Sequence, residues 1–244
     1  MSGDIIKGGK SPAVSSSVEV AAFLRQAALV PVARTGRRGR LLFAMDATAS
    51  RQPTWDRAQA IQADMFASTD ALGGLDIQLV YFRGFGECQA SGWFAEGRKL
   101  GAAMASISCA PGQTQIGKVV RHAIKAAGEQ KLNAVVFVGD AMEESADELV
   151  SEAGKLGMLG VPLFVFHEGG EEHAAACFRA MAKATSGAYC SFDASSPGVL
   201  RDLLSAVAIY AAGGRAALDD FSRRSGTAVQ KLIEQVSGKE RPSK

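Results

Sequence analysis

The stretch Arg40–Ser50, RLLFAMDATAS, decides the fold class and supplies the first candidate site residues. An apolar run of strand length, Leu41–Met45, ends abruptly in Asp46, and two hydroxyls follow at Thr48 and Ser50. Open α/β sheets place their ligand sites at the carboxyl ends of parallel strands, so a carboxylate here is a candidate ligand. Oxygen-only side chains favour a hard divalent cation such as Mg²⁺ over zinc. The alternative is that Thr48 or Ser50 caps the following helix.

Two later segments add oxygen ligands of the same kind. The loop Ala110–Gly117, APGQTQIG, places Thr114 just before an amphipathic helix. The run Ala134–Asp140, AVVFVGD, is a second buried-strand pattern, and it ends in an aspartate. The chain therefore offers Asp-x-Thr-x-Ser, then a lone Thr, then a strand-end Asp, in that order.

This ordered set resembles the von Willebrand factor A (VWA) domain family, of the bacterial cytoplasmic type. The resemblance extends to the family's metal-ion-dependent adhesion site, whose pattern is Asp-x-Ser-x-Ser, Thr and Asp. It covers roughly residues 38–213, and the phrase GQTQIG at 112–117 is similar to the family's loop into its next helix. The resemblance implies one Mg²⁺ (or Mn²⁺) ion, held by hydroxyls and, largely through water, by carboxylates. The implied metal ligands are Asp46, Thr48, Ser50, Thr114 and Asp140.

Two positions depart from the family pattern. Thr48 stands where Ser is usual, which keeps a hydroxyl at that place. The segment after Asp140 reads Ala-Met-Glu-Glu, where the family commonly has a glycine. Glu143 and Glu144 either tune the rim of the site or form a solvated helix start favoured by the N-terminal dipole, and the second interpretation is preferred.

Strand and helix patterns alternate along residues 38–213, with one early hairpin. Strand patterns lie at 41–45, 75–83, 89–94, 134–140, 162–167 and 189–192, and helical spacing at 55–65, 100–107, 116–127, 146–156, 173–185 and 199–212. Alternation of this kind makes a parallel sheet covered by helices. We therefore expect a doubly wound, Rossmann-like α/β fold: a mostly parallel central sheet with one antiparallel edge strand and helices on both faces.

Composition divides the chain into four regions. Residues 1–17 are rich in Ser, Gly and Lys, which predicts disorder, and residues 18–37 read as an N-terminal helix and a basic linker. The VWA-like domain spans residues 38–213. Residues 214–244 read as a C-terminal helix and polar tail. The apolar stripe of this helix predicts packing on the domain, and an exposed docking helix is the alternative.

Charge and hydropathy exclude several classes of function. A net charge of +2 over 244 residues argues against nucleic acid and acidic membranes as partners. No run approaches the roughly 20 apolar residues of a membrane span, and Val18–Val32 is too interrupted by charge for a signal peptide. We expect a cytoplasmic protein. Its four widely spaced cysteines predict free thiols, with disulfides as the alternative.

The expected function is a metal-dependent adaptor module that binds a protein partner. An ion held mainly by neutral oxygens keeps a preference for an anionic ligand, so the partner should present an Asp or Glu. No enzyme activity is expected, because no nucleophile elbow and no nucleotide-binding glycine motif occurs in the sequence.

Two alternatives stay open. One is a Mg²⁺-dependent phosphatase of the haloacid dehalogenase type with Asp46 as nucleophile, assisted by Thr114, Lys118, Asp140 and Glu144. Position 48 is a threonine, so the second aspartate that serves that family as general acid is missing. The other alternative is a VWA scaffold with a vestigial metal site.

Overall fold

The computed structural model describes residues 38–192 and 197–223, without the side chains of Pro197 and Ser222. The predictions for residues 1–37 and for the tail beyond residue 223 lie outside this part of the chain. No helix that the structure describes is both long and apolar enough to cross a membrane.

A six-stranded sheet in the order β3-β2-β1-β4-β5-β6 forms the centre of the described unit. Its strands are β1 (Gly39–Asp46), β2 (Leu75–Arg83), β3 (Glu87–Phe94), β4 (Ala134–Gly139), β5 (Leu163–Glu168) and β6 (Ala188–Phe192). All neighbours pair in parallel except β2 and β3, so the early hairpin supplies an antiparallel edge strand.

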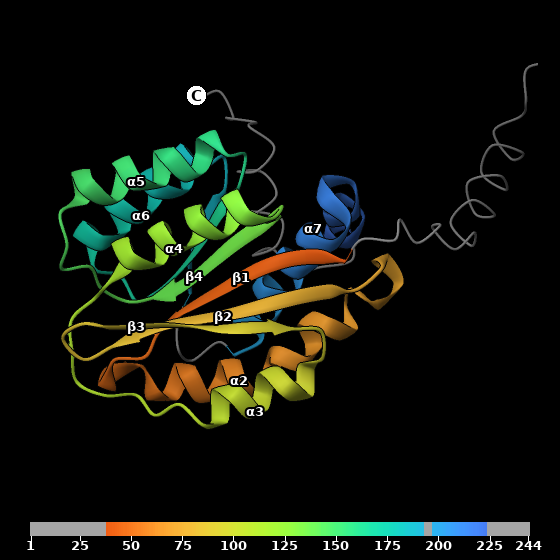
Figure 1. The fold of residues 1–244 in the computed structure, drawn as a ribbon, viewed down its shortest axis with the longest axis horizontal. Helices are drawn as coiled ribbons and strands as arrows, with labels where there is room; N and C mark the ends of the chain where they lie inside the picture. The colour runs from red at the N-terminus through yellow and green to blue at the C-terminus, as the bar shows by residue number, and fades with distance from the viewer. Residues whose placement is uncertain (1–37, 193–196, 224–244) are drawn as a thin grey trace, which may run out of the picture. The chain divides into compact units, whose positions relative to one another are not determined.

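Helices cover both faces of this sheet (Figure 1). One face carries α2 (Gln52–Ala67), α3 (Gly97–Ala105) and α7 (Pro197–Ser222), and the other carries α4 (Ile116–Glu129), α5 (Ala146–Met158) and α6 (Glu172–Ala184). Two short 3₁₀ turns, η1 (Ala49–Arg51) and η2 (Asp70–Leu72), flank α2. The predicted doubly wound α/β fold is confirmed.

Strand β1 is buried on both of its faces. Leu41 and Phe43 point into the core beneath α2 and α7, whereas Leu42 and Ala44 point into the core beneath α4, α5 and α6. A strand buried on both sides needs apolar residues at every position, which explains the unbroken run before Asp46. Asp46 ends this strand while still only 1% exposed.

Parallel pairing brings several strand ends to the same edge of the sheet. Asp46 lies beside Phe82 of β2, and the preceding Met45 lies beside Val138 of β4. Asp140, which follows β4, therefore lies at the edge that holds Asp46. The turn of the β2–β3 hairpin lies at the same edge, because β2 runs parallel to β1 and ends beside Asp46.

The C-terminal helix changes direction at Gly214, whose φ of 69° interrupts the helical backbone inside α7. Leu218, beyond this kink, is fully buried in the core that α7 shares with α2. All four cysteines are free thiols in the structure, in agreement with their spacing.

Candidate metal site

Asp46 is a buried carboxylate fixed by its own strand end. The backbone N–H of Thr48 donates to Asp46 Oδ1 at 2.7 Å, and the Ala47 N–H continues the sheet by donating to the Phe82 carbonyl. The pKa of Asp46 is raised to about 6, mainly by burial and to a lesser extent by the charge of Asp140, against the hydrogen bonds from Thr48 and the Arg51 charge, which lower it. Asp46 is therefore a carboxylate that the fold leaves short of positive charge.

The hydroxyls of Thr48 and Ser50 do not cap a helix. Thr48 precedes η1 without a capping hydrogen bond from its side chain, and α2 begins after Arg51, which also gives no side-chain cap. Thr48 is half-buried and pairs in a short parallel bridge with Ala110, whereas Ser50 is exposed. The capping alternative is wrong, and both hydroxyls lack a structural role in starting the helix.

A buried arginine lies between two of the strand-end carboxylates. Arg51 is 4% exposed, and its guanidinium pairs with Asp140 at 3.4 Å and with Glu168, which also accepts the Thr54 hydroxyl. In the part of the chain described here, Arg51 Nε is buried without a hydrogen-bond partner. Asp140, predicted to be a metal ligand, thus already has a positively charged partner.

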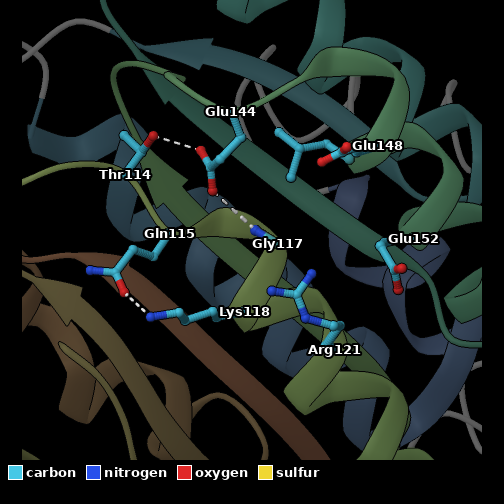
Figure 2. Close-up of a pocket in the computed structure, with 9 residues that line it drawn as sticks. Thr114, Gln115, Gly117, Lys118, Arg121, Glu144, Glu148 and Glu152 are labelled. Carbon is cyan, nitrogen blue, oxygen red and sulfur yellow. Dashed lines mark hydrogen bonds between the residues drawn. The ribbon is translucent and has the colours of Figure 1, made fainter. Parts of the chain in front are cut away.

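Thr114 is held by the segment that follows Asp140 (Figure 2). Its hydroxyl donates to Glu144 Oε2 at 2.6 Å and accepts the Glu143 backbone N–H at 2.9 Å, while its own N–H donates to Glu143 Oε2 at 2.9 Å. The other oxygen of Glu144 accepts the Gly117 N–H in the first turn of α4. The interpretation of Glu143 and Glu144 as a solvated helix start is therefore wrong. Both bind Thr114 before α5 begins, and Glu144 also accepts an N–H at the start of α4.

A cavity of about 210 Å³ opens beside the Thr114–Glu144 contact, between the starts of α4 and α5 (Figure 2). Lys118 and Arg121 line one side, and Glu148 and Glu152 line the other. The cavity places solvent next to Thr114, so this candidate ligand is accessible from outside although only 8% exposed.

Lys118, which the phosphatase alternative requires beside Asp46, is bound elsewhere, and so is the buried His167. Lys118 Nζ donates to the Gly86 carbonyl at 2.9 Å and to Gln115 Oε1 at 2.8 Å, which directs it toward the β2–β3 hairpin. His167, buried at the end of β5, is engaged by the Tyr189 hydroxyl and the Asp140 carbonyl. Both side chains have structural partners, and neither is free to act on a substrate at Asp46.

The donor chemistry fits a hard divalent cation. Within residues 38–192 and 197–223, no three His, Cys, Asp or Glu side chains form a metal cage, so an ion here depends on hydroxyls. Asp46, Asp140 and Glu168 face a single guanidinium, an excess of two negative charges that a divalent ion would balance. Asp46 and Thr48 are in contact, whereas Thr114 and Asp140 already have Glu144 and Arg51 as partners. Among the described residues no hydrogen bond joins Ser50 to the other four.

Sequence reasoning missed Arg51 and Glu168. A signal for Glu168 exists, because it ends β5 as Asp46 ends β1, and the strand-end rule applied a third time would have found it. Arg51 directly follows Ser50, but nothing local shows that its side chain turns inward.

Comparison with known proteins defines the fold. No protein-family model matches the chain, and no curated protein matches its sequence significantly. Solved structures do match. The SpRpn10 VWA domain is 15% identical with a TM-score of 0.53, over 78% of this chain and 96% of that domain. The vWF domain of the pilus tip protein Mfa5 from Porphyromonas gingivalis is 10% identical with a TM-score of 0.53, over 70% and 94%.

A third match concerns the metal. Proximal thread matrix protein 1 from the mussel byssus, solved with a zinc-occupied metal-ion-dependent adhesion motif, is 13% identical with a TM-score of 0.54. The match covers 80% of this chain and 53% of the mussel protein, so the chain spans about half its length. This protein therefore has the fold of a VWA domain, as its sequence predicted, whereas its five metal ligands stay a prediction.

Proposed function

We propose that the chain is a protein-binding module that holds a Mg²⁺ or Mn²⁺ ion with Asp46, Thr48, Ser50, Thr114 and Asp140. The observation that supports this most directly is Asp46, a buried carboxylate with no basic side chain within salt-bridge distance among the described residues. Burying an unpaired carboxylate is costly, and a metal ion at the same edge would remove that cost.

The chain's own residues set the character of the site. Thr48 and Ser50 offer neutral hydroxyls, and the Thr48 N–H orients Asp46. Arg51 limits the negative charge by pairing with Asp140 and Glu168. A bound divalent ion would supply an open coordination position for an anionic oxygen, so a partner's Asp or Glu is the expected ligand.

Titration calorimetry with MgCl₂ and MnCl₂ tests the site. The wild type should bind one ion, and Asp46→Asn should abolish binding because it removes the buried charge without changing shape. Asp64→Asn is the matched control, since Asp64 is an exposed acid on α2 paired with Arg201, and it should bind as the wild type does. Unchanged metal binding in Asp46→Asn would refute the assignment.

A second candidate is a VWA scaffold that works without metal. It is favoured by two contacts: the Arg51 guanidinium already pairs with Asp140, and the Thr114 hydroxyl is already satisfied by Glu144. In this case neither ion gives a heat of binding, and thermal melts in EDTA and in millimolar Mg²⁺ coincide. A rise in melting temperature with Mg²⁺ excludes this candidate, because only a ligand of the native state stabilises it.

A further inference from the structure

The tip of the β2–β3 hairpin, Gly84–Gly86, presents an exposed aromatic side chain. Phe85 is 85% exposed, between two glycines, at the edge of the sheet that holds Asp46. Single exposed apolar residues are common on protein surfaces, so exposure alone assigns no role. The hydrogen bonds that hold this tip distinguish it from an ordinary exposed turn.

The hairpin tip is fixed by hydrogen bonds to its backbone carbonyls. The Gln115 side-chain amide donates to the carbonyls of Arg83, Gly84 and Glu87 at 3.1, 3.4 and 3.2 Å. The Gln113 N–H donates to the Gly84 carbonyl at 3.0 Å, and Lys118 Nζ donates to the Gly86 carbonyl at 2.9 Å. Carbonyls of a turn are usually left to water, so these hydrogen bonds fix a tip whose one large apolar side chain, Phe85, is exposed.

Close backbone packing adds to this order. A Cβ on Gly112 would lie 2.2 Å from the Gly84 nitrogen, so the loop and the hairpin touch backbone to backbone. Gly84 itself has a φ of 61°, which a side chain would oppose. Neither the loop at Gly112 nor the hairpin tip can shift without breaking these contacts.

The same loop positions the hairpin tip and a candidate metal ligand. Gln113 and Gln115, which hold the tip, are the two neighbours of Thr114 in the sequence. A partner that reaches an ion at Thr114 therefore meets Phe85 at a fixed place beside it. Rigid aromatic side chains lose little entropy on binding and dominate many protein interfaces.

Two cations lie near the tip. Lys118 Nζ donates to the Gly86 carbonyl, and Arg121 lines the same side of the cavity beside Thr114, opposite Glu148 and Glu152. Both cations lie close enough to Cys88 of β3 for their charge to lower its pKa against the effect of burial. Cations on the α4 side attract an approaching carboxylate.

We infer that Phe85 is the apolar anchor of the partner-binding surface. The partner is a protein segment in which an Asp or Glu lies next to an apolar cluster that encloses the Phe85 ring. This inference rests on the proposed function, because it takes the ion at Asp46 as the second point of contact.

Peptide selection tests the inference without knowledge of the natural partner. A phage-displayed random peptide library is selected on the full chain in millimolar MgCl₂. Enriched sequences are synthesised with a fluorophore, and binding is followed by anisotropy. We expect an Asp or Glu at a constant spacing from an aromatic or branched apolar residue.

Two matched variants distinguish a specific anchor from nonspecific hydrophobic binding. Phe85→Ala should weaken binding of the selected peptides at least tenfold while leaving the melting temperature and Mg²⁺ affinity as in the wild type. Met158→Ala is the control, because Met158 is 88% exposed but lies at the end of α5, a helix that starts at the metal-site edge and runs away from it. It should bind within twofold of the wild type.

The outcomes distinguish the inference from the function on which it rests. Peptides that need Mg²⁺ and Asp46 but bind Phe85→Ala normally overturn the anchor and leave the function standing. Peptides that bind equally in EDTA and to Asp46→Asn overturn the metal-dependent function. A selection that enriches no metal-dependent peptide, or peptides without an apolar position, overturns the anchor as well.

Discussion

The two halves of the candidate metal site differ in how they are satisfied. The first half, at the end of β1, consists of Asp46, Thr48 and Ser50, and Asp46 is held there by hydrogen bonds from Thr48. The second half, Thr114 and Asp140, is bound by a glutamate and an arginine of the protein itself. The first half therefore has unused capacity for a cation, whereas the second already has partners within the protein.

The two halves have opposite effects on the free energy of metal binding. Without an ion, the buried Asp46 carboxylate has no cation to compensate the cost of its burial, so the first half favours binding from the outset. Arg51 and Glu144 lower the energy of the empty site, so they reduce the net gain from an ion. The metal affinity is set by the balance between the two halves, and variants of each half test that balance separately.

Arg51→Met should have the largest effect, because it removes the buried cation and keeps a side chain of similar length. Glu168 and Asp140 then lose their partner, and breaking a buried ion pair from one side costs about 3–5 kcal/mol. Urea unfolding at pH 7 in EDTA measures the loss. Millimolar Mg²⁺ should restore part of the lost stability, because the ion supplies a cation in place of the guanidinium.

The control for this variant is Arg201→Met, because Arg201 forms an ion pair with Asp64 on the surface, where its side chain is 57% exposed. Exposed pairs contribute about 0–1 kcal/mol, so the free energy of unfolding should hardly change. Equal losses in the two variants would mean that the buried guanidinium balances no charge.

Asp46→Asn should stabilise the metal-free protein at neutral pH. The folded-state pKa of Asp46, about 6, lies above its ordinary value of 3.8, so the stability linked to this group is complete below about pH 4 and is lost as the pH rises through 6. Asparagine is neutral at every pH. The variant should therefore gain about 2–3 kcal/mol over the wild type at pH 7.5 and almost nothing at pH 4.

Unfolding curves in EDTA at the two pH values, for the wild type, Asp46→Asn and Asp64→Asn, measure this gain. Asp64 is exposed, so its substitution should change stability by less than about 0.5 kcal/mol at either pH. A gain that is the same at pH 4 and pH 7.5 would show that the charge of Asp46 is not its source.

The contrast between the halves also explains which features could be predicted. β1 could be predicted because the unbroken apolar run that ends in Asp46 is a local pattern. Alternation of strand and helix patterns was enough for the doubly wound sheet, because each pattern is local. Most boundaries differed by at most three residues, as at β3, which begins at Glu87 rather than Gln89, but α7 ends at Ser222, ten residues beyond the expected 212.

The second half could not be predicted because its contacts join distant residues. Arg51 and Glu168 are 117 residues apart, and Thr114 and Glu144 are 30 residues apart. Periodicity places each on an element but does not show which way a long side chain turns once the elements pack. The sequence shows the two glutamates that follow Asp140. Their role in holding Thr114 depends on how the two loops meet in the folded chain.

The smallest changes in stability are expected for substitutions of Thr114 and Ser50. Thr114→Val keeps the shape of the side chain but leaves the Glu143 N–H without its acceptor and Glu144 with one donor fewer, which should cost about 1–2 kcal/mol in EDTA. Ser50→Ala removes an exposed hydroxyl and should cost less than about 0.5 kcal/mol. Both should lower Mg²⁺ affinity in calorimetry, because each removes a proposed ligand. If Ser50→Ala binds Mg²⁺ as the wild type does while Thr114→Val does not, the exposed hydroxyl is no ligand and the first half of the site consists of Asp46 and Thr48 alone.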